Sequence, residues 1–212
     1  MRIFRDRKDA GQRLAEALDS YAGPDTVVVG LPRGGVPVAA EVARRLRAPL
    51  DVFVVRKLGV PFQPELAMGA IASGGVLVRN EEVLRLLPDA EASLARVRER
   101  EQVLLAEREA LYRGRRPALD VTGKRVIVVD DGVATGATMK AAVMALRGAG
   151  AAGVVVAVPV GAPGTCRELE DMADALVCLQ VPRMFSAVGQ WYEDFGQTTD
   201  EEVEAILRSD GA

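Results

Sequence analysis

Short runs of apolar, β-branched residues recur along the chain and alternate with segments in which apolar residues follow a helical spacing. Strands that are apolar along their whole length are buried on both faces, which is typical of a parallel sheet covered by helices. The sequence therefore predicts a doubly wound α/β fold, with a mainly parallel sheet and helices on both faces. The expected strands are Thr26–Gly30, Leu50–Val55, Ala70–Val78, Arg125–Asp130, Gly153–Val158 and Ala175–Leu179, and the expected helices are Asp9–Ser20, Val36–Arg47, Ala137–Gly148 and Gly164–Ala173.

A long charged segment, residues 80–116, interrupts this alternation and predicts a helical insertion. Asn80 and Asp89 are suitable N-caps, and charges of both signs alternate after them. A thin apolar stripe could dock the insertion on the domain or on a second subunit, and its residues are Leu94, Val97, Leu104 and Leu111. No linker is evident, so we expect one domain over residues 1–212 that ends in a C-terminal hood at residues 181–212. We also expect a homodimer or another homo-oligomer.

The composition excludes several kinds of site. The 212 residues include no histidine, which excludes Ser-His-Asp and Cys-His catalysis as well as histidine-based zinc sites. The net charge of −3 offers no general attraction to nucleic acid or to an anionic membrane surface. Cys166 and Cys178 could form one disulfide, but buried free thiols in a reducing cytosol are favoured.

The compartment can also be inferred from two stretches of the chain. The N-terminal residues carry too many charges for the apolar region of a signal peptide. The uncharged run from Gly148 to Cys166 contains several Gly and Pro residues, and only Val154–Val160 is continuously apolar, which indicates a buried strand and not a membrane span. We therefore expect a cytoplasmic protein with no membrane or nucleic-acid partner.

The stretch Val126–Met139 carries the clearest chemistry. Four apolar residues form a buried strand, the adjacent acids Asp130 and Asp131 follow, and a loop of small residues leads into a helix. The backbone N–H groups of such a loop can converge on one anion, and the helix N-terminus adds partial positive charge. The neighbouring acids can accept hydrogen bonds from sugar hydroxyls, so the stretch predicts a sugar-phosphate site. The loop, named the phosphate cradle below, consists of Gly132, Val133, Ala134, Thr135, Gly136, Ala137 and Thr138.

A strand that ends in a capped turn, with Asp131 as the capping group, is the simpler alternative. The complete order of apolar strand, acid pair and Gly/Thr loop favours a ligand site instead. This stretch closely resembles the signature of type I phosphoribosyltransferases, which use phosphoribosyl pyrophosphate (PRPP). The resemblance covers about Thr26–Leu179. It implies that the phosphate cradle binds the 5′-phosphate, and that Asp130 and Asp131 are catalytic residues that bind the ribose hydroxyls and ligate Mg²⁺ mostly through them or through water.

Members of that family have an earlier loop that binds pyrophosphate. The segment Gly30–Val36 follows the first expected strand and precedes a helix, as such a loop should. Arg33 offers a fork of donors for phosphate oxygens, and two glycines allow close approach of the backbone. The resemblance implies a non-proline cis peptide bond, expected at Arg33–Gly34, and pyrophosphate binding by Pro32, Arg33, Gly34 and Gly35.

A third loop of the family is mobile and closes over the reaction. The segment Val55–Leu66 follows the second expected strand and occupies the corresponding place. Arg56 and Lys57 resemble an Arg-Lys pair that helps to hold pyrophosphate in some relatives, so both are candidate catalytic and pyrophosphate-binding residues. For either cation alone, a solvated strand end is the alternative.

The acceptor is not identified by these motifs. Members that act on 6-oxopurines have an Asp at the place of Ala134, and a Lys beyond the strand that here leads into Val158–Ala162. Both departures count against a 6-oxopurine. The aromatic residues of the hood could stack on a planar base or simply cover the open edge of the sheet. The candidate acceptor-binding residues are Val158, Phe185, Trp191 and Tyr192.

The resemblance implies attack of an acceptor nitrogen on C1′ of PRPP, with Mg²⁺ as cofactor and pyrophosphate as leaving group. Such chemistry depends on positioned charge and on exclusion of water more than on acid–base groups, so it does not require histidine. The expected partners are PRPP and a small, nucleobase-like acceptor. A non-catalytic sensor of PRPP or a nucleotide is the alternative, although a binder has no need of a closing loop with Arg56 and Lys57.

Overall fold

The computed structural model describes residues 3–114 and 116–210. Its centre is a five-stranded sheet in the order β2-β1-β6-β7-β8, in which every neighbouring pair is parallel. This confirms the predicted α/β fold and its parallel sheet. The strands are β1 (Thr26–Gly30), β2 (Leu50–Val52), β6 (Arg125–Val129), β7 (Gly153–Val160) and β8 (Ala175–Gln180).

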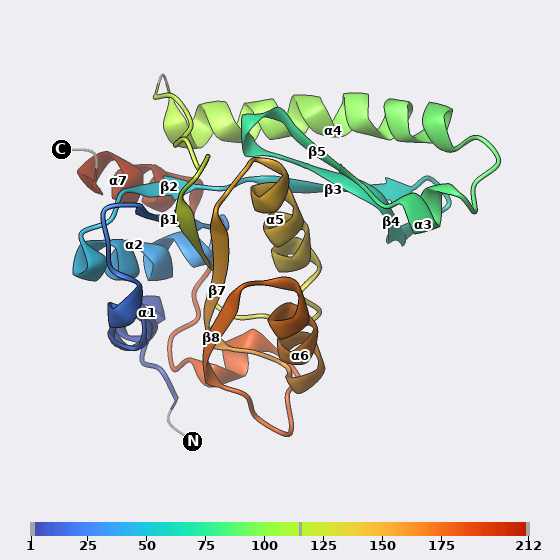
Figure 1. The fold of residues 1–212 in the computed structure, drawn as a ribbon. Coiled ribbons are helices and arrows are strands. Elements are labelled where there is room, and N and C mark those ends of the chain that lie inside the picture. Colours follow the sequence, from blue (N-terminus) through green and yellow to red (C-terminus); the bar gives the residue numbers. More distant parts are fainter. Residues whose placement is uncertain (1–2, 115, 211–212) are drawn as a thin grey trace.

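Helices cover both faces of the central sheet (Figure 1). On one face, α1 (Arg7–Ala17) and α2 (Gly35–Leu46) pack on alternate strand residues such as Val28 and Ile127. On the other face, α5 (Ala137–Gly148) and α6 (Pro163–Met172) pack on the intervening residues, such as Val128. The chain turns to opposite sides after β1 and after β6, so the carboxyl ends of these two neighbours form a switch point where open α/β sheets bind ligands.

A second sheet of three antiparallel strands was not predicted. It consists of β3 (Val55–Val60), β4 (Gln63–Ala72) and β5 (Val76–Arg79). The expected strand Leu50–Val55 leaves the central sheet after Val52, and the expected strand Ala70–Val78 is broken by a turn in which Gly74 and Gly75 have positive φ. The expected loop Val55–Leu66 is therefore wrong: this segment is most of a β-hairpin.

The insertion contains the short α3 (Glu81–Leu84) and the long α4 (Ala90–Arg113), which lies along the small sheet (Figure 1). Asn80 caps α3 by accepting a hydrogen bond from the Val83 N–H, whereas the Asp89 side chain forms no capping bond. The predicted apolar stripe is only half correct, because Leu104 and Leu111 are exposed. The buried face of α4 is instead formed by Leu94, Val97, Glu101, Leu105 and Tyr112.

The C-terminal segment returns to the core. Two elements were not predicted, the 3₁₀ turn Val188–Trp191 and the helix α7 (Asp200–Asp210), which packs Val203 and Leu207 against the interior. Phe4 forms a parallel bridge with Tyr192, so the N-terminal residues lie beside the C-terminal segment that precedes α7. Short 3₁₀ turns also occur at Asp19–Tyr21 and Ser73–Gly75. No helix within residues 3–114 and 116–210 is long and apolar enough to cross a membrane.

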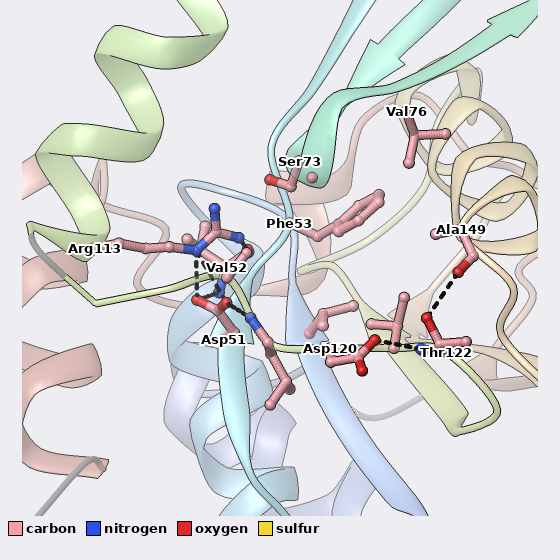
Figure 2. Close-up of a pocket in the computed structure, with 14 residues that line it drawn as sticks. Asp51, Val52, Phe53, Ser73, Val76, Arg113, Asp120, Thr122 and Ala149 are labelled. Atoms are coloured by element: carbon pink, nitrogen blue, oxygen red, sulfur yellow. Dashed lines mark hydrogen bonds and ion pairs between the residues drawn. The ribbon is translucent and has the colours of Figure 1, made fainter.

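A buried ion pair joins the end of α4 to the central sheet (Figure 2). The Arg113 Nε donates to both carboxylate oxygens of Asp51, at 3.1 and 3.0 Å, and its Nη2 donates to the Val52 carbonyl at 2.6 Å. The Leu119 N–H also donates to Asp51, at 2.9 Å. The pair lines a cavity of about 340 Å³ whose polar groups are largely paired within the protein, so we assign this cavity a structural role.

Candidate active site

The acid pair lies at the carboxyl end of β6, as predicted. Asp130 and Asp131 are partly buried, and the Asp131 N–H donates to Asp130 Oδ1 at 2.8 Å. Burial raises the pKa of Asp130 well above its ordinary value, and the charge of Asp131 raises it further. Burial also raises the pKa of Asp131, although Arg7 opposes this rise. A ligand that donates hydroxyl hydrogens and brings cations would favour the ionised form of both acids.

The glycines of the second predicted loop bring it against the acid pair. A Cβ on Gly34 would overlap Asp131 Oδ2, and one on Gly35 would lie 2.6 Å from the Val129 carbonyl oxygen and 3.1 Å from Asp130 Oδ1. Only glycine permits this approach, so the start of α2 and the end of β6 form one continuous surface. The cis peptide bond lies at Pro32–Arg33 and not at the predicted Arg33–Gly34. Gly34 has helical dihedrals and is the N-cap of α2.

The phosphate cradle forms the turn between β6 and α5. Two hydrogen bonds to β7 and α6 fix its backbone. The Val133 N–H donates to the Val160 carbonyl, and the Thr165 hydroxyl donates to the Ala134 carbonyl at 2.5 Å. Ala134, Thr135, Ala137 and Thr138 are exposed, whereas Gly132, Val133 and Gly136 are buried. The cradle thus presents its small residues and the N-terminus of α5 to solvent, as an anion site requires.

Gly136 is expected to be essential to the cradle, because it adopts φ +69° and a Cβ there would collide with Thr165 Cγ2. The substitution Gly136→Val should lower the free energy of unfolding by about 2–4 kcal/mol through the left-handed backbone and overpacking. It should also weaken ribose 5-phosphate binding by more than about tenfold. Calorimetry and thermal unfolding measure the two effects.

The matched control is Gly150→Val. Gly150 has φ +83° at the other end of α5, and a Cβ there would meet Thr122 at an ordinary 3.5 Å. This variant should lose stability but retain ribose 5-phosphate binding. Equal ribose 5-phosphate affinity in the two variants would contradict an anion site at the cradle.

The two predicted cations lie on β3 and not on a loop. Arg56 donates from Nε and Nη2 to Glu101 Oε2 of α4, at 2.9 and 2.6 Å. Arg56 also lines a cavity of about 260 Å³ together with Pro32, Arg33 and Thr138. The structure therefore brings the predicted pyrophosphate loop, one predicted cation and the last residue of the cradle to one cavity. Lys57 lines the adjoining groove, outside that cavity.

Arg7 belongs to the site and was missed by the sequence analysis. Its Nε donates to Asp131 Oδ2 at 2.8 Å, and the side chains of this ion pair are only 13% and 14% exposed. Its Nη1 donates to the Gly196 carbonyl at 2.6 Å, and its guanidinium lies 4.0 Å from the centre of the Phe195 ring. Arg7 thus connects the N-terminus and the C-terminal segment to the acid pair. No local signal reveals it, because 124 residues separate Arg7 from Asp131.

We expect Arg7→Gln to weaken PRPP binding about tenfold, because Asp131 would lose the charged donor that orients it and favours its ionised form. The effect should appear mainly in the KM for PRPP. Arg5→Gln is the control, since Arg5 pairs with Asp9 through a side chain that is 70% exposed. Equal KM values for the two variants would show that Arg7 does not act on the acid pair.

The candidate acceptor residues are dispersed. Val158 is fully buried in the core, so its side chain is not available to a ligand. Tyr192 is also buried and donates its hydroxyl to the Asp131 carbonyl at 2.6 Å, which fixes the C-terminal segment to the site. Its ring packs between those of Phe4 and Phe195. Phe185 and Trp191 are partly exposed and remain available for stacking.

The two cysteines are free and lie next to each other beneath the cradle. Their sulfur atoms are 3.9 Å apart, and Cys166 is buried. This agrees with the interpretation as free thiols. A Cβ on Gly161 would collide with Cys166 Sγ, so glycine at this position allows β7 to pass close to the thiol.

The chain resembles known proteins over nearly its whole length. The family model "Phosphoribosyl transferase domain" matches residues 4–195. Two curated proteins of Mycobacterium tuberculosis, from strains H37Rv and CDC 1551 and each named "Putative phosphoribosyl transferase", are 50% identical over 98% of this chain. The alignment covers 47% of each of them, so the chain spans about half their length.

The crystal structure of the protein TT1426 from Thermus thermophilus superposes on this chain with a TM-score of 0.91 at 49% identity, and the superposition covers 99% of both chains. Together with the acid pair and the three converging segments, these matches show that the chain belongs to the phosphoribosyl transferase domain family.

Proposed function

We propose that the chain transfers the 5-phosphoribosyl group of PRPP to a nitrogen of a nucleobase-like acceptor and releases pyrophosphate. The observation that carries this proposal is the close packing of Gly34 and Gly35 on the acid pair, beside the phosphate cradle. A 5′-phosphate, a ribose diol and a pyrophosphate then each have a separate group of residues within one site.

The residues of this chain act mainly by position and charge. The cradle would fix the 5′-phosphate, and Asp130 and Asp131 would accept hydrogen bonds from the ribose hydroxyls. As the bond from C1′ to pyrophosphate breaks, negative charge grows on the leaving group, which Arg33 and Arg56 can stabilise. The partial positive charge that grows at C1′ is favoured by the nearby carboxylates.

The acid pair is compatible with a magnesium ion that the substrate largely carries. Among the described residues, no group of three or more His, Cys, Asp or Glu side chains could hold a metal ion by itself. Asp130 and Asp131 offer carboxylate oxygens, which Mg²⁺ prefers, but too few for a complete shell. Mg²⁺ bound by PRPP, by water and indirectly by these acids would offset the charge of the departing pyrophosphate.

The acceptor would enter beside the C-terminal segment, which we propose as a hood over the ribose. Tyr192 and Arg7 join this segment to Asp131. Phe185 and Trp191 offer partly exposed rings against which a planar base could stack. The methyl side chain of Ala134 cannot accept a hydrogen bond from a ring nitrogen. This supports a phosphoribosyl acceptor other than a 6-oxopurine.

The test is turnover of isotope-labelled PRPP with Mg²⁺ and a panel of nucleobases, with release of pyrophosphate as the readout. At least one base should give base-dependent release and a labelled nucleotide. PRPP binding without release for any base would support the alternative, a non-catalytic PRPP sensor on the same fold. The position of Arg56 at the pyrophosphate cavity favours catalysis, since it is placed to stabilise the leaving group.

A further inference from the structure

A basic groove lies between β3 and α4, next to the pyrophosphate cavity. Its volume is about 730 Å³, within the range of about 300–1,000 Å³ that small-molecule sites occupy. Arg56 and Lys57 line it from β3, and Arg96 and Arg100 line it from α4. Glu101 is the one acidic residue among its described lining residues.

Three arginines and one carboxylate, Glu101, leave the groove with a net positive charge. The Glu101 side chain is 8% exposed and accepts from Arg56 at 2.6 Å and from Arg100 at 2.9 Å. Burial raises the pKa of Glu101, but these two arginines outweigh that effect and hold its pKa below the ordinary value. One carboxylate thus orients two guanidinium groups without cancelling both charges. Arg96 is exposed and forms no ion pair with any residue in the described part of the chain.

The groove is distinct from the cavity assigned to the pyrophosphate of PRPP. The two adjoin through Val55, Arg56 and Thr138, but the groove does not include Arg33. Neither cavity is lined by Asp130 or Asp131. The proposed function assigns the pyrophosphate of PRPP to the smaller cavity, where Arg33 and Arg56 lie, and this assignment leaves the groove accessible.

We propose that this groove binds a second anion, an oligophosphate chain, beside the pyrophosphate of PRPP. Its position relative to PRPP rests on the proposed function. Arg96 and Arg100 are one helical turn apart and face the groove together with the cations of β3, which suits a row of phosphates. Val55, Val60, Pro61 and Val97 supply only small apolar surfaces, and no described lining residue is aromatic. The phosphate chain, and not a stacked base, is then the part that is recognised.

The test is calorimetric titration of the full chain with tripolyphosphate at low salt, with ribose 5-phosphate present to fill the cradle. Arg96→Gln and Arg100→Gln should each weaken tripolyphosphate binding about tenfold, as expected for loss of a charged hydrogen-bond donor. The matched control is Arg98→Gln, because Arg98 lies on a different face of α4 with Glu99 and Val103. It should bind like the parent.

Two results would overturn the proposal. One is absence of tripolyphosphate binding to the parent at millimolar concentration, and the other is equal affinity in all three variants. Melting temperatures of Arg96→Gln and Arg98→Gln should match the parent, whereas Arg100→Gln should lower the melting temperature because it removes a partner of the buried Glu101. Ribose 5-phosphate affinity should match the parent in every variant. An Arg96→Gln effect confined to tripolyphosphate therefore reports the groove and not a change in folding.

A parallel titration with ATP separates a free oligophosphate from a nucleoside triphosphate as the source of the chain. Equal affinities would show that the phosphates alone are recognised, and tighter binding of ATP would show that the nucleoside adds contacts. The proposal requires Arg96 dependence for tripolyphosphate in both cases. If Arg96-dependent binding occurs without PRPP turnover, the transferase proposal fails and the groove stands; turnover without such binding contradicts the groove alone.

Discussion

Replacing Asp130 and Asp131 together by asparagine is expected to lower the affinity for Mg·PRPP by about a hundredfold or more, because two charged hydrogen-bond acceptors are lost. The fold should persist. Burial raises the pKa of both carboxyls, so neutral side chains of the same shape suit the folded state. Asparagine can also keep the 2.8 Å bond from the residue 131 N–H to the residue 130 side chain. Calorimetry with Mg·PRPP and thermal unfolding measure the two properties.

A matched double variant controls for the loss of two charges. Asp19 and Asp25 pair with Arg45 and Lys124 on the surface, with side chains that are 55% and 73% exposed. Asp19→Asn with Asp25→Asn should leave Mg·PRPP affinity unchanged. Unaltered affinity in the folded Asp130→Asn, Asp131→Asn protein would refute the ribose-binding role of the acid pair.

Arg113→Met is expected to lower the free energy of unfolding by about 3–5 kcal/mol, because it leaves the Asp51 carboxylate buried without its cation. The side chains of this pair are 7% and 10% exposed, so bulk solvent reaches the Asp51 carboxylate poorly. Denaturant unfolding measures the loss. Arg45→Met removes an exposed partner of Asp19 and should change stability little.

The second half of this test removes the Asp51 carboxylate that Arg113→Met leaves without a partner. Combining Arg113→Met with Asp51→Asn should restore part of the lost stability, since no ionised group then lacks a partner. An additive loss in the double variant would mean that the ion pair does not account for the effect. PRPP binding by the folded fraction should be retained, because Asp51 and Arg113 line a cavity apart from the acid pair.

The central sheet was predictable because its strands are apolar on both faces and therefore form uninterrupted apolar runs in the sequence. β1 has the expected bounds, and β6, β7 and β8 differ from expectation only at their ends. The small sheet was not predictable in the same way. On β3 the polar residues Arg56 and Lys57 precede the buried Leu58, and on β4 the buried run begins only at Met68. Leu58 and Met68 are covered by α4 and by neighbours remote in sequence. Strands that begin with polar residues resemble loops until their partners are known.

The candidate site likewise contains some parts that the sequence could predict and others that it could not. The acid pair, the cradle and the Gly34–Gly35 loop are contiguous motifs, and the parallel sheet brings strand ends to one edge, so their meeting could be predicted. Arg7, Glu101 and Thr165 act across long sequence separations through side-chain hydrogen bonds. Nothing in their local sequence indicates those partners. The Val158 side chain lies in the core. A position in a strand does not by itself reveal whether its side chain meets a ligand or the core.

The close approach of Gly34 to Asp131 also couples the evolution of two positions that are far apart in the sequence. Any side chain at residue 34 would enter the space of the Asp131 carboxylate, so residue 34 cannot change from glycine while Asp131 is kept. In a library randomised at both positions, residues other than glycine at 34 should survive only with a smaller residue at 131, and such pairs would forfeit the ribose contact. Two segments that are far apart in the sequence, but follow neighbouring strands of the sheet, would thus evolve together. Selection on sugar binding by Asp131 would then also preserve the glycine at position 34.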